Sequence, residues 1–381
     1  MVEWISQLAA DFEIHIYSQR VEDLDPSAIT WHHVPHLPGP HLFGFLWWFA
    51  SNRFCRTWDR WFRGLRYDLV YSPGPNCFDA EVISVHVVFA EYVHRVKAEM
   101  SFARSPLSAF PRLIHRKLYY KVAVLLERLM YSRPGVTLFS ISRKTAADLA
   151  RIYGRRDPVR VIYAGLDHSK FNSAARSALR DEARKALGFS PAQFVLLLIG
   201  NDWRNKGVPV LLEAVSALGV LPIHVLVVSS ESPASHLTAV RGSGLVDRVH
   251  ILPVRSDVEF YYAAADAYIG PSLEDAYALP PAEAMACGLP VIVSASAGVS
   301  EVVTDGVDGL ILRDPTDVKS LVAMIRRLYE DKEFRNRLGN RASETARRYT
   351  WERNGRDLAE IFEEVLRRKA RPGIQTLSQE S

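Results

Sequence analysis

Two carboxylates that stand eight positions apart, Asp275 and Glu283, could recognise hydroxyl groups. Asp275 lies in a loop after the short apolar run 267–270. Glu283 lies in the first turn of a helix that Pro280 and Pro281 open, because proline suits a first helical turn. Ionised carboxylates accept hydrogen bonds, so both groups could hold the hydroxyls of a sugar or a ribose. A carboxylate that only complements the dipole of its helix would show the same pattern.

Groups that favour anions flank these carboxylates on both sides. Downstream, a loop of small residues follows a second apolar run, and backbone amides near Gly298 and Val299 could face a phosphate. Upstream, a loop that begins at Gly200 leads into an amphipathic helix and carries Arg204 and Lys206. Two exposed basic residues in an ordinary turn are the alternative for this upstream loop.

A parallel sheet is needed to position these groups. Apolar runs suited to buried strands alternate with helices in the second half of the chain, which is typical of a doubly wound parallel sheet. The expected strands are 194–199, 223–228, 249–252, 267–270, 290–293 and 309–312. Two strand ends and two helix starts converge on the carboxylates, and ligands of open α/β sheets bind in such a crevice.

The first half of the chain predicts another sheet, with an unusual beginning. A helix is expected at 2–10, and strands are expected at 13–18, 29–34, 68–72, 82–88, 137–141 and 159–164. An α/β domain normally opens with a strand and a glycine-rich turn, so the first strand of this domain is expected to be missing. His86 falls near the end of an expected strand, where a purely structural histidine is the alternative to a catalytic one.

Composition limits the class of protein. A chain of 381 residues, 48% of them hydrophobic, can bury the cores of roughly two domains. Its net charge of +4 is too small to indicate a nucleic-acid partner. The three cysteines show no paired spacing, which favours a reducing compartment without disulfides or zinc. No signal peptide is expected, and the apolar runs are far shorter than the ~20 residues that span a bilayer.

A basic and aromatic helix is expected at 47–66. Its arginines recur at steps of three and four residues: Arg53, Arg56, Arg60 and Arg63. Tryptophan and phenylalanine residues stand between them, so the helix could lie in the interface of an anionic membrane. A second basic and aromatic helix at 102–133 could extend that surface. The alternative is an ordinary helix whose aromatic side chains pack on the domain while its arginines face water.

The stretch from Asp275 to Gly288 resembles the donor-sugar motif of retaining glycosyltransferases of family 4, which have the GT-B fold. Asp275 takes the position of the family's first glutamate, Glu283 takes that of its second, and Leu279 begins its Leu-Pro pair. The neighbouring Glu274 could serve in place of Asp275. The resemblance implies that the first acid touches the transferred sugar and that the second binds the nucleotide ribose.

The loop after Gly200 is similar to the family's loop whose arginine and lysine clamp the donor diphosphate. Lys206 matches in register, whereas Asn201 stands at the usual arginine position, so Arg204 would supply the second charge. Glu301 is in register with a family glutamate near the donor, and simple helix capping is its alternative role.

Other positions are compared with the family in the same way. Arg255 lies in a loop where the family's backbone reads the base, and His86 stands where the family often has a histidine that faces the acceptor and the sugar. Ala276 and Ala278 depart from the pattern, because glycines are usual at both positions. This departure matters because alanine does not easily adopt a positive φ angle.

The resemblance implies an α/β, GT-B architecture of two Rossmann-like, doubly wound parallel-sheet domains with a cleft between them. Residues 1–190 would form the acceptor-side domain, and residues 191–349 would bind the nucleotide sugar. Helix 350–369 would cross back to the N-terminal domain, and residues 370–381 would be a disordered tail.

The expected activity is the retaining transfer of a hexose-like sugar from a nucleotide-diphosphate sugar to a glycan, a lipid-linked acceptor or a small molecule, within cell-envelope polysaccharide biosynthesis. No metal or other cofactor is expected, since Lys206, Arg204 and backbone amides would stabilise the leaving diphosphate. We expect a cytoplasmic protein with a peripheral contact to the inner face of the membrane. The alternatives are a non-catalytic GT-B subunit that binds a nucleotide sugar or a partner transferase, another GT-B enzyme such as a phosphorylase or epimerase, and a membrane-surface binding protein.

Overall fold

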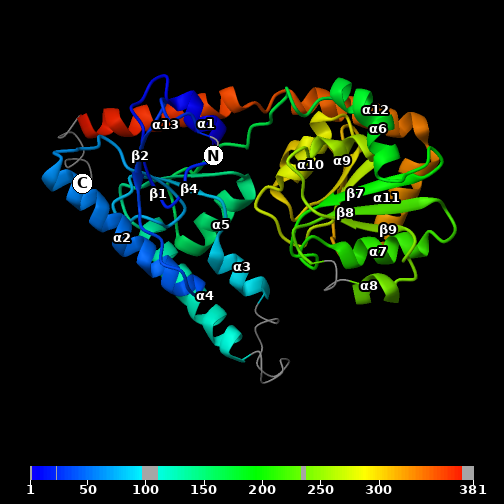
Figure 1. Cartoon of the computed structure of the whole chain (residues 1–381), viewed down its shortest axis with the longest axis horizontal. Coiled ribbons are helices and arrows are strands. Elements are labelled where there is room, and N and C mark those ends of the chain that lie inside the picture. The colour runs from blue at the N-terminus through cyan, green and yellow to red at the C-terminus, as the bar shows by residue number, and fades with distance from the viewer. Residues whose placement is uncertain (1, 23, 97–109, 233–236, 371–381) are drawn as a thin grey trace, which may run out of the picture. The chain divides into compact units, whose positions relative to one another are not determined.

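The chain folds into two α/β units (Figure 1). The computed structural model describes residues 2–22, 24–96, 110–232 and 237–370, so the tail expected at 370–381 lies outside the described residues from 371 onward. Unit 1 comprises Met1–Tyr163 and Trp351–Ser381, and unit 2 comprises Ala164–Thr350. Strands pair in parallel in both units, which confirms the predicted α/β class.

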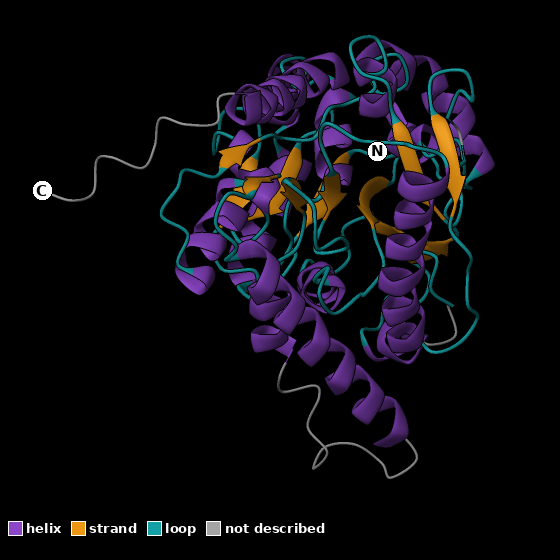
Figure 2. Cartoon of the chain, turned by 90° about the vertical axis from the view of Figure 1, so that its left-hand side faces the viewer, coloured by secondary structure: helices purple, strands orange, loops and turns teal. Residues whose placement is uncertain are grey.

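Unit 1 contains two parallel sheets whose strands lie among helices (Figure 2). One sheet pairs β1 (His15–Ser18) with β2 (Thr30–His33). The other has the order β3 (Tyr71–Pro73), β4 (Val82–Val85), β5 (Thr137–Ser140) and β6 (Arg160–Val161). The helices are α1 (Val2–Leu8), α2 (His41–Phe62), α3 (Phe89–Val96), α4 (Phe110–Tyr131), α5 (Arg143–Tyr153) and α13 (Trp351–Ala370). Among the described residues, no helix is both long and apolar enough to cross a bilayer.

The two ends of the chain share one core in unit 1. Helix α13 buries Leu358, Ile361, Phe362 and Val365 in a cluster that also contains Leu8 of α1. These four positions recur at helical spacing and form the apolar face that the sequence pattern predicts.

Unit 2 is a doubly wound domain with a six-stranded parallel sheet. The strand order is β12 (Leu310–Leu312), β11 (Val291–Ser294), β10 (Ala267–Gly270), β7 (Phe194–Ile199), β8 (Ile223–Val228) and β9 (Val249–Leu252). The helices are α6 (Ser173–Ala186), α7 (Val208–Ala217), α8 (Leu237–Gly242), α9 (Glu259–Ala264), α10 (Leu279–Ala286), α11 (Val318–Glu330) and α12 (Lys332–Ala346), with the 3₁₀-helix η4 (Gly298–Val302). In Figure 1, α7 lies on one face of this sheet and α9 and α10 lie on the other. The central strands are buried on both faces, so they read as continuous apolar runs.

The boundary between the units falls after Tyr163, upstream of the boundary expected at residue 190. Helix α6 belongs to unit 2 because its arginines bind the end of α9. The guanidinium groups donate hydrogen bonds to backbone carbonyls of residues 262–265: Arg176, Arg180 and Arg184. Those carbonyls have no partner within their own helix, so the arginines stabilise its C-terminal end. The polar, arginine-rich residues of α6 are therefore part of unit 2.

Candidate active site

Predicted donor-site residues meet in unit 2 where the order of the strands reverses. The chain runs outward from β7 through β8 to β9 and then returns to β10 on the other side of β7. The loops that follow β7 and β10 are joined by two hydrogen bonds. The Leu273 amide donates to the Asn205 carbonyl (2.7 Å), and Asn205 Nδ2 donates to the Glu274 carbonyl (2.8 Å). Ligands of open α/β sheets bind at such a reversal.

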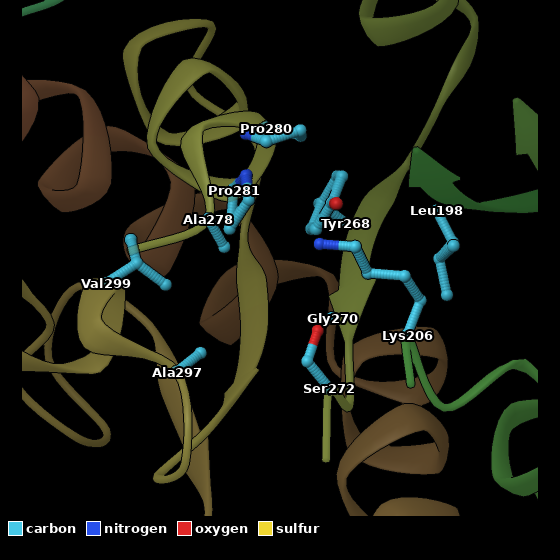
Figure 3. A pocket seen from close by; sticks show the side chains of 10 residues that line it. All are labelled: Leu198, Lys206, Tyr268, Gly270, Ser272, Ala278, Pro280, Pro281, Ala297 and Val299. Atoms are coloured by element: carbon cyan, nitrogen blue, oxygen red, sulfur yellow. The ribbon is translucent and has the colours of Figure 1, made fainter. Parts of the chain in front are cut away.

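Lys206 and Asp275 form an ion pair across these two loops. Lys206 Nζ lies 2.5 Å from Asp275 Oδ2, and the two side chains are 23% and 16% exposed. The other carboxylate oxygen, Oδ1, accepts a hydrogen bond from the Tyr277 amide (3.3 Å). Figure 3 shows the Lys206 side chain extended beside Tyr268, with its ammonium group directed toward Pro281 at the start of α10. A partly buried cation is thus held where a diphosphate could bind it.

Two glycines give this lysine and its loop their space. A Cβ atom on Gly200 would lie 2.8 Å from Lys206 Cε, and a Cβ atom on Gly207 would lie 2.1 Å from the Pro271 carbonyl oxygen. Gly207 also has a φ of +75°, which side-chain-bearing residues rarely adopt. The loop of Lys206 can therefore approach the end of β10 only with glycine at position 207. Gly200, a predicted donor-site residue, gives room to the lysine stem.

Ala278 has a positive φ angle of 68° at the N-terminal boundary of α10. The resemblance to family 4 places a glycine at this position, and the backbone here has the conformation that glycine favours. Alanine adopts it at a cost on the order of 1 kcal/mol. The loop between Asp275 and α10 thus has a strained backbone at Ala278, where glycine would fit without strain.

Glu283 is held by a buried tyrosine. The Tyr262 hydroxyl donates a 2.6 Å hydrogen bond to Glu283 Oε2, and Tyr262 is fully buried. Burial raises the pKa of the Glu283 carboxyl above its ordinary value, while the hydrogen bond from Tyr262 and the charge of Lys170 oppose that rise. Helix α10 begins at Leu279, so Glu283 lies one residue beyond the first turn in which it was predicted. Tyr262 fixes the orientation of the carboxylate and leaves Oε1 for a hydroxyl of a ligand.

The backbone amides of Gly298 and Val299 do not have the predicted role. The Gly298 amide donates to the Asp275 carbonyl (3.0 Å), and the Val299 amide donates to the Tyr277 carbonyl (2.7 Å). The prediction that these amides are free for a phosphate is therefore wrong. Their hydrogen bonds connect the loop after β11 to the loop of Asp275, so both residues stabilise the conformation of that loop.

The remaining predicted donor-site residues of unit 2 have different environments. Arg204 is exposed on the turn before Lys206, Glu274 is half-buried beside Asp275, and Glu301 is half-buried in η4. Arg255 donates to both carboxylate oxygens of Asp257 (2.8 and 2.7 Å), so an acidic neighbour already binds its guanidinium group. Asp275 therefore pairs with Lys206, whereas Arg255 pairs with Asp257.

His86 belongs to unit 1, where it follows β4. Its Nε2 lies 3.0 Å from Ser84 Oγ, and that hydroxyl lies 2.6 Å from the Tyr71 hydroxyl. The imidazole is exposed at the carboxyl end of the strand, where the sequence predicts it. Its ring is therefore oriented by a serine within its own sheet.

Several residues that shape the site were not predicted. A small pocket beside the ion pair is lined by Leu198, Lys206, Tyr268, Gly270, Ser272, Ala278, Pro280, Pro281, Ala297 and Val299 (Figure 3). Tyr268 and Ser272 are buried in this lining, while Asn205 and Tyr262 hold the loop and the carboxylate. Tyrosines within the apolar runs 260–265 and 267–270 were the available signal, because a buried hydroxyl needs a hydrogen-bond partner.

Part of unit 2 is similar to known proteins. Residues 180–345 match the family model described as Glycosyl transferases group 1. D-inositol 3-phosphate glycosyltransferase of Xylanimonas cellulosilytica is 31% identical over 248 residues, which cover 61% of this chain and 58% of that protein. The chain thus spans little more than half the length of the curated relatives it matches.

Solved structures resemble nearly the whole chain. WaaG, a glycosyltransferase involved in lipopolysaccharide biosynthesis, is similar with a TM-score of 0.75 at 20% identity, over 94% of each chain. Anabaena HepE in complex with UDP-glucose is similar with a TM-score of 0.71 at 19% identity, over 95% of this chain and 94% of that one. The chain therefore has the GT-B fold, and its residues 180–345 match the model of the Glycosyl transferases group 1 family.

Proposed function

We propose that this protein is a retaining glycosyltransferase of family 4 that uses a nucleotide-diphosphate sugar. The observation that carries the proposal is the ion pair of Lys206 with Asp275 at the strand reversal of a group 1 domain. A half-buried carboxylate, Glu283, lies on the helix that follows the same loop. Together these groups offer one cation for a diphosphate and two carboxylates for hydroxyl groups.

Lys206 has the main role in the proposed reaction. The bond between the sugar C1 and the diphosphate oxygen breaks, and the leaving diphosphate gains negative charge. The acceptor oxygen forms a bond to C1 on the same face, and its proton passes to the leaving phosphate oxygen. The Lys206 ammonium stabilises the developing charge, and loss of one such preorganised group costs roughly 10²–10³ in rate. Because side chains provide this charge, turnover should be unchanged in excess EDTA.

Asp275 and Glu283 hold the two ends of the proposed donor. Asp275 keeps the lysine ammonium in place and lies on the loop that would contact the transferred sugar. Glu283, oriented by Tyr262, accepts hydrogen bonds from the ribose hydroxyls of the nucleotide. Recognition of both ends fixes the C1–oxygen bond near Lys206, which lowers the entropic cost of reaching the transition state.

The acceptor we propose is a lipid-linked or lipopolysaccharide-type glycan of the cell envelope, and the place of action is the cytoplasmic face of a membrane. The similarity to WaaG, which is involved in lipopolysaccharide biosynthesis, supports this acceptor class. The structure of HepE with UDP-glucose supports a nucleoside diphosphate as the leaving group.

Calorimetric titration with UDP, GDP and ADP tests the donor site. One of the three nucleotides should bind, and its affinity should fall about 10- to 100-fold in Lys206→Ala and in Glu283→Ala. Lys319→Ala, which removes an exposed lysine of the same unit, is the matched control and should bind as the wild type does. A folded protein that binds none of the three nucleotides would overturn the proposal. The anomeric configuration of the product, read by NMR, tests retention.

A non-catalytic GT-B subunit that binds a nucleotide sugar is the second candidate. Ala276 and Ala278 favour it, because both stand where the family has glycines and Ala278 is strained. This candidate predicts nucleotide binding that depends on Lys206 without hydrolysis or transfer of the sugar. Donor turnover that is lost in Lys206→Ala would exclude it.

A further inference from the structure

Helix α2 lies on unit 1 with its polar residues inward. The buried residues of α2 are Leu42, Ser51, Asn52 and Asp59. Asp59 accepts a hydrogen bond from the Tyr17 hydroxyl (2.6 Å) and lies 2.9 Å from His32 Nδ1. Arg56 is largely buried and pairs with Asp79 through both carboxylate oxygens. Because partners satisfy these inward polar groups, the helix can expose its apolar face instead.

The outward face of α2 carries a stripe of aromatic side chains. Trp61 is 77% exposed, Phe62 68% and Phe54 65%, and Trp58 stacks on Phe62 with ring centroids 4.1 Å apart. Nearer the start of the helix, Phe43, Leu46 and Trp47 are exposed as well, and Trp47 lies two helical turns before Phe54. The alternative in which the aromatic side chains pack on the domain is therefore wrong for these positions. Exposed apolar surface of this extent marks an interaction site.

Helix α4 lies beside α2 and repeats the pattern (Figure 1). The two helices touch through the rings of Phe45 and Tyr119, whose centroids are 5.7 Å apart. Apolar side chains of α4 are exposed at helical spacing: Ile114, Leu118, Leu125 and Leu129. Two neighbouring helices thus expose apolar stripes along their length. A surface helix of an ordinary domain instead turns its apolar stripe toward the core.

Charge on these two helices has one sign at the surface. Their acidic residues, Asp59 and Glu127, are both buried. The exposed charged residues are Arg53, Arg60, Arg112, Lys121 and Arg128. A second copy of this chain would bring cations against cations, which is unfavourable. A surface with dense negative charge over an apolar interior matches both the arginines and the aromatic stripe.

We propose that α2 and α4 form the face through which this protein binds an anionic lipid bilayer. Tryptophan and phenylalanine side chains of α2 enter the interface between headgroups and acyl chains, and the exposed cations bind lipid phosphates. The surface lies wholly within unit 1, and its function does not depend on sugar transfer. Failure of vesicle binding would therefore leave nucleotide binding by unit 2 intact.

Co-sedimentation of the full chain with vesicles tests the proposal. The protein should sediment with vesicles of phosphatidylcholine and phosphatidylglycerol, but weakly with phosphatidylcholine alone, and added salt should release it. Arg53→Glu, Arg60→Glu and Arg128→Glu together should weaken binding by at least about 100-fold, since each surface cation contributes roughly a factor of five. The matched control, Arg313→Glu, Lys319→Glu and Lys332→Glu, changes net charge equally in unit 2 and should bind within a few-fold of the wild type.

The aromatic stripe is tested separately from the charge. Phe54→Ser with Trp61→Ser keeps every cation and should abolish insertion, seen as loss of the blue shift of tryptophan fluorescence on vesicle addition. A far-ultraviolet circular dichroism spectrum and a urea unfolding transition like those of the wild type show that each variant is folded. The proposal is overturned if the wild-type protein does not bind anionic vesicles. It is overturned too if the unit 2 control triple variant loses vesicle binding to the same extent as the triple variant of α2 and α4. It is also overturned if sedimentation velocity shows a dimer that Trp61→Ser dissociates while vesicles have no effect.

Discussion

The ammonium group of Lys206 lies 2.5 Å from a carboxylate oxygen of Asp275, although 69 positions separate them in the sequence. Pairing of β7 with β10, with Leu197 opposite Tyr268, brings the ends of the two strands together. The order of the strands reverses between them, and ligands of open α/β sheets bind at such a reversal. The two motifs that carry the resemblance to family 4 are therefore one structural site.

Asp275→Asn should reduce sugar transfer on the order of 10²–10³, because the lysine loses its ionic partner and the sugar loses a charged acceptor. Nucleotide affinity should change much less, since Lys206 keeps its own charge. Steady-state kinetics with the donor identified by calorimetry measure both effects.

Glu274→Gln is the matched control for this substitution. The two acids are adjacent, but only Asp275 pairs with Lys206, so Glu274→Gln should retain most of the activity. A large loss in Glu274→Gln together with a small loss in Asp275→Asn would assign the first acidic position of the family to Glu274 instead.

Strands and helix boundaries of unit 2 could be predicted because their signals are local. The run 194–199 coincides with β7, and Gly288, just after the end of α10, has the positive φ angle that glycine favours there. A strand buried on both faces is apolar throughout, and a left-handed residue after a helix favours glycine. Each pattern is complete within a few residues, so the sequence alone indicates it.

Features that depend on distant partners could not be predicted. The Gly298 amide is bound by the Asp275 carbonyl, which comes from a different loop. The inward polar face of α2 depends on Tyr17 and His32, which come from β1 and β2. Periodicity shows that a helix has two faces, but the choice of inward face rests on what the neighbouring elements offer.

Gly207→Ala should destabilise unit 2 by more than about 3 kcal/mol and abolish nucleotide binding. The new Cβ atom would lie 2.1 Å from the Pro271 carbonyl, at a φ of +75°. Gly219→Ala is the control that measures backbone strain without a steric clash. Gly219 has a φ of +67°, and no atom lies within 4 Å of the added Cβ atom. That control should cost only about 1 kcal/mol in denaturant titrations. Equal costs for the two variants would contradict the close approach of the two loops.

Ala278→Gly should stabilise the protein by about 1 kcal/mol, because glycine relieves the strain at a φ of 68°. The gain is limited by the greater freedom of glycine in the unfolded chain. Ala178→Gly, at an exposed position inside α6, is the control and should destabilise by roughly 0.5–1 kcal/mol. Opposite shifts of the two denaturation midpoints are expected. Destabilisation by both substitutions would mean that Ala278 is not strained.

Glu127 should make the stability of unit 1 depend on pH. This carboxyl on α4 is completely buried and accepts hydrogen bonds from the amides of Phe89 (2.8 Å) and Ala90 (3.2 Å) and from Tyr153. Burial outweighs these hydrogen bonds and raises the pKa of Glu127 from 4.5 to about 7. The folded state therefore binds the proton more tightly than the unfolded state, and the stabilisation from protonation is fully present below about pH 4.5 and is lost as the pH rises through about 7.

The loss across this interval should be on the order of 3 kcal/mol, and Glu127→Gln should remove it because glutamine stays neutral. Urea unfolding of the variant between pH 4.5 and pH 7, the limits set by the two pKa values, measures the slope. Glu360→Gln, an exposed residue of α13 in the same unit, should keep the wild-type slope. If Glu127→Gln retains that slope as well, the carboxylate is ionised throughout the interval, and the hydrogen bonds that fix the start of α3 outweigh its burial.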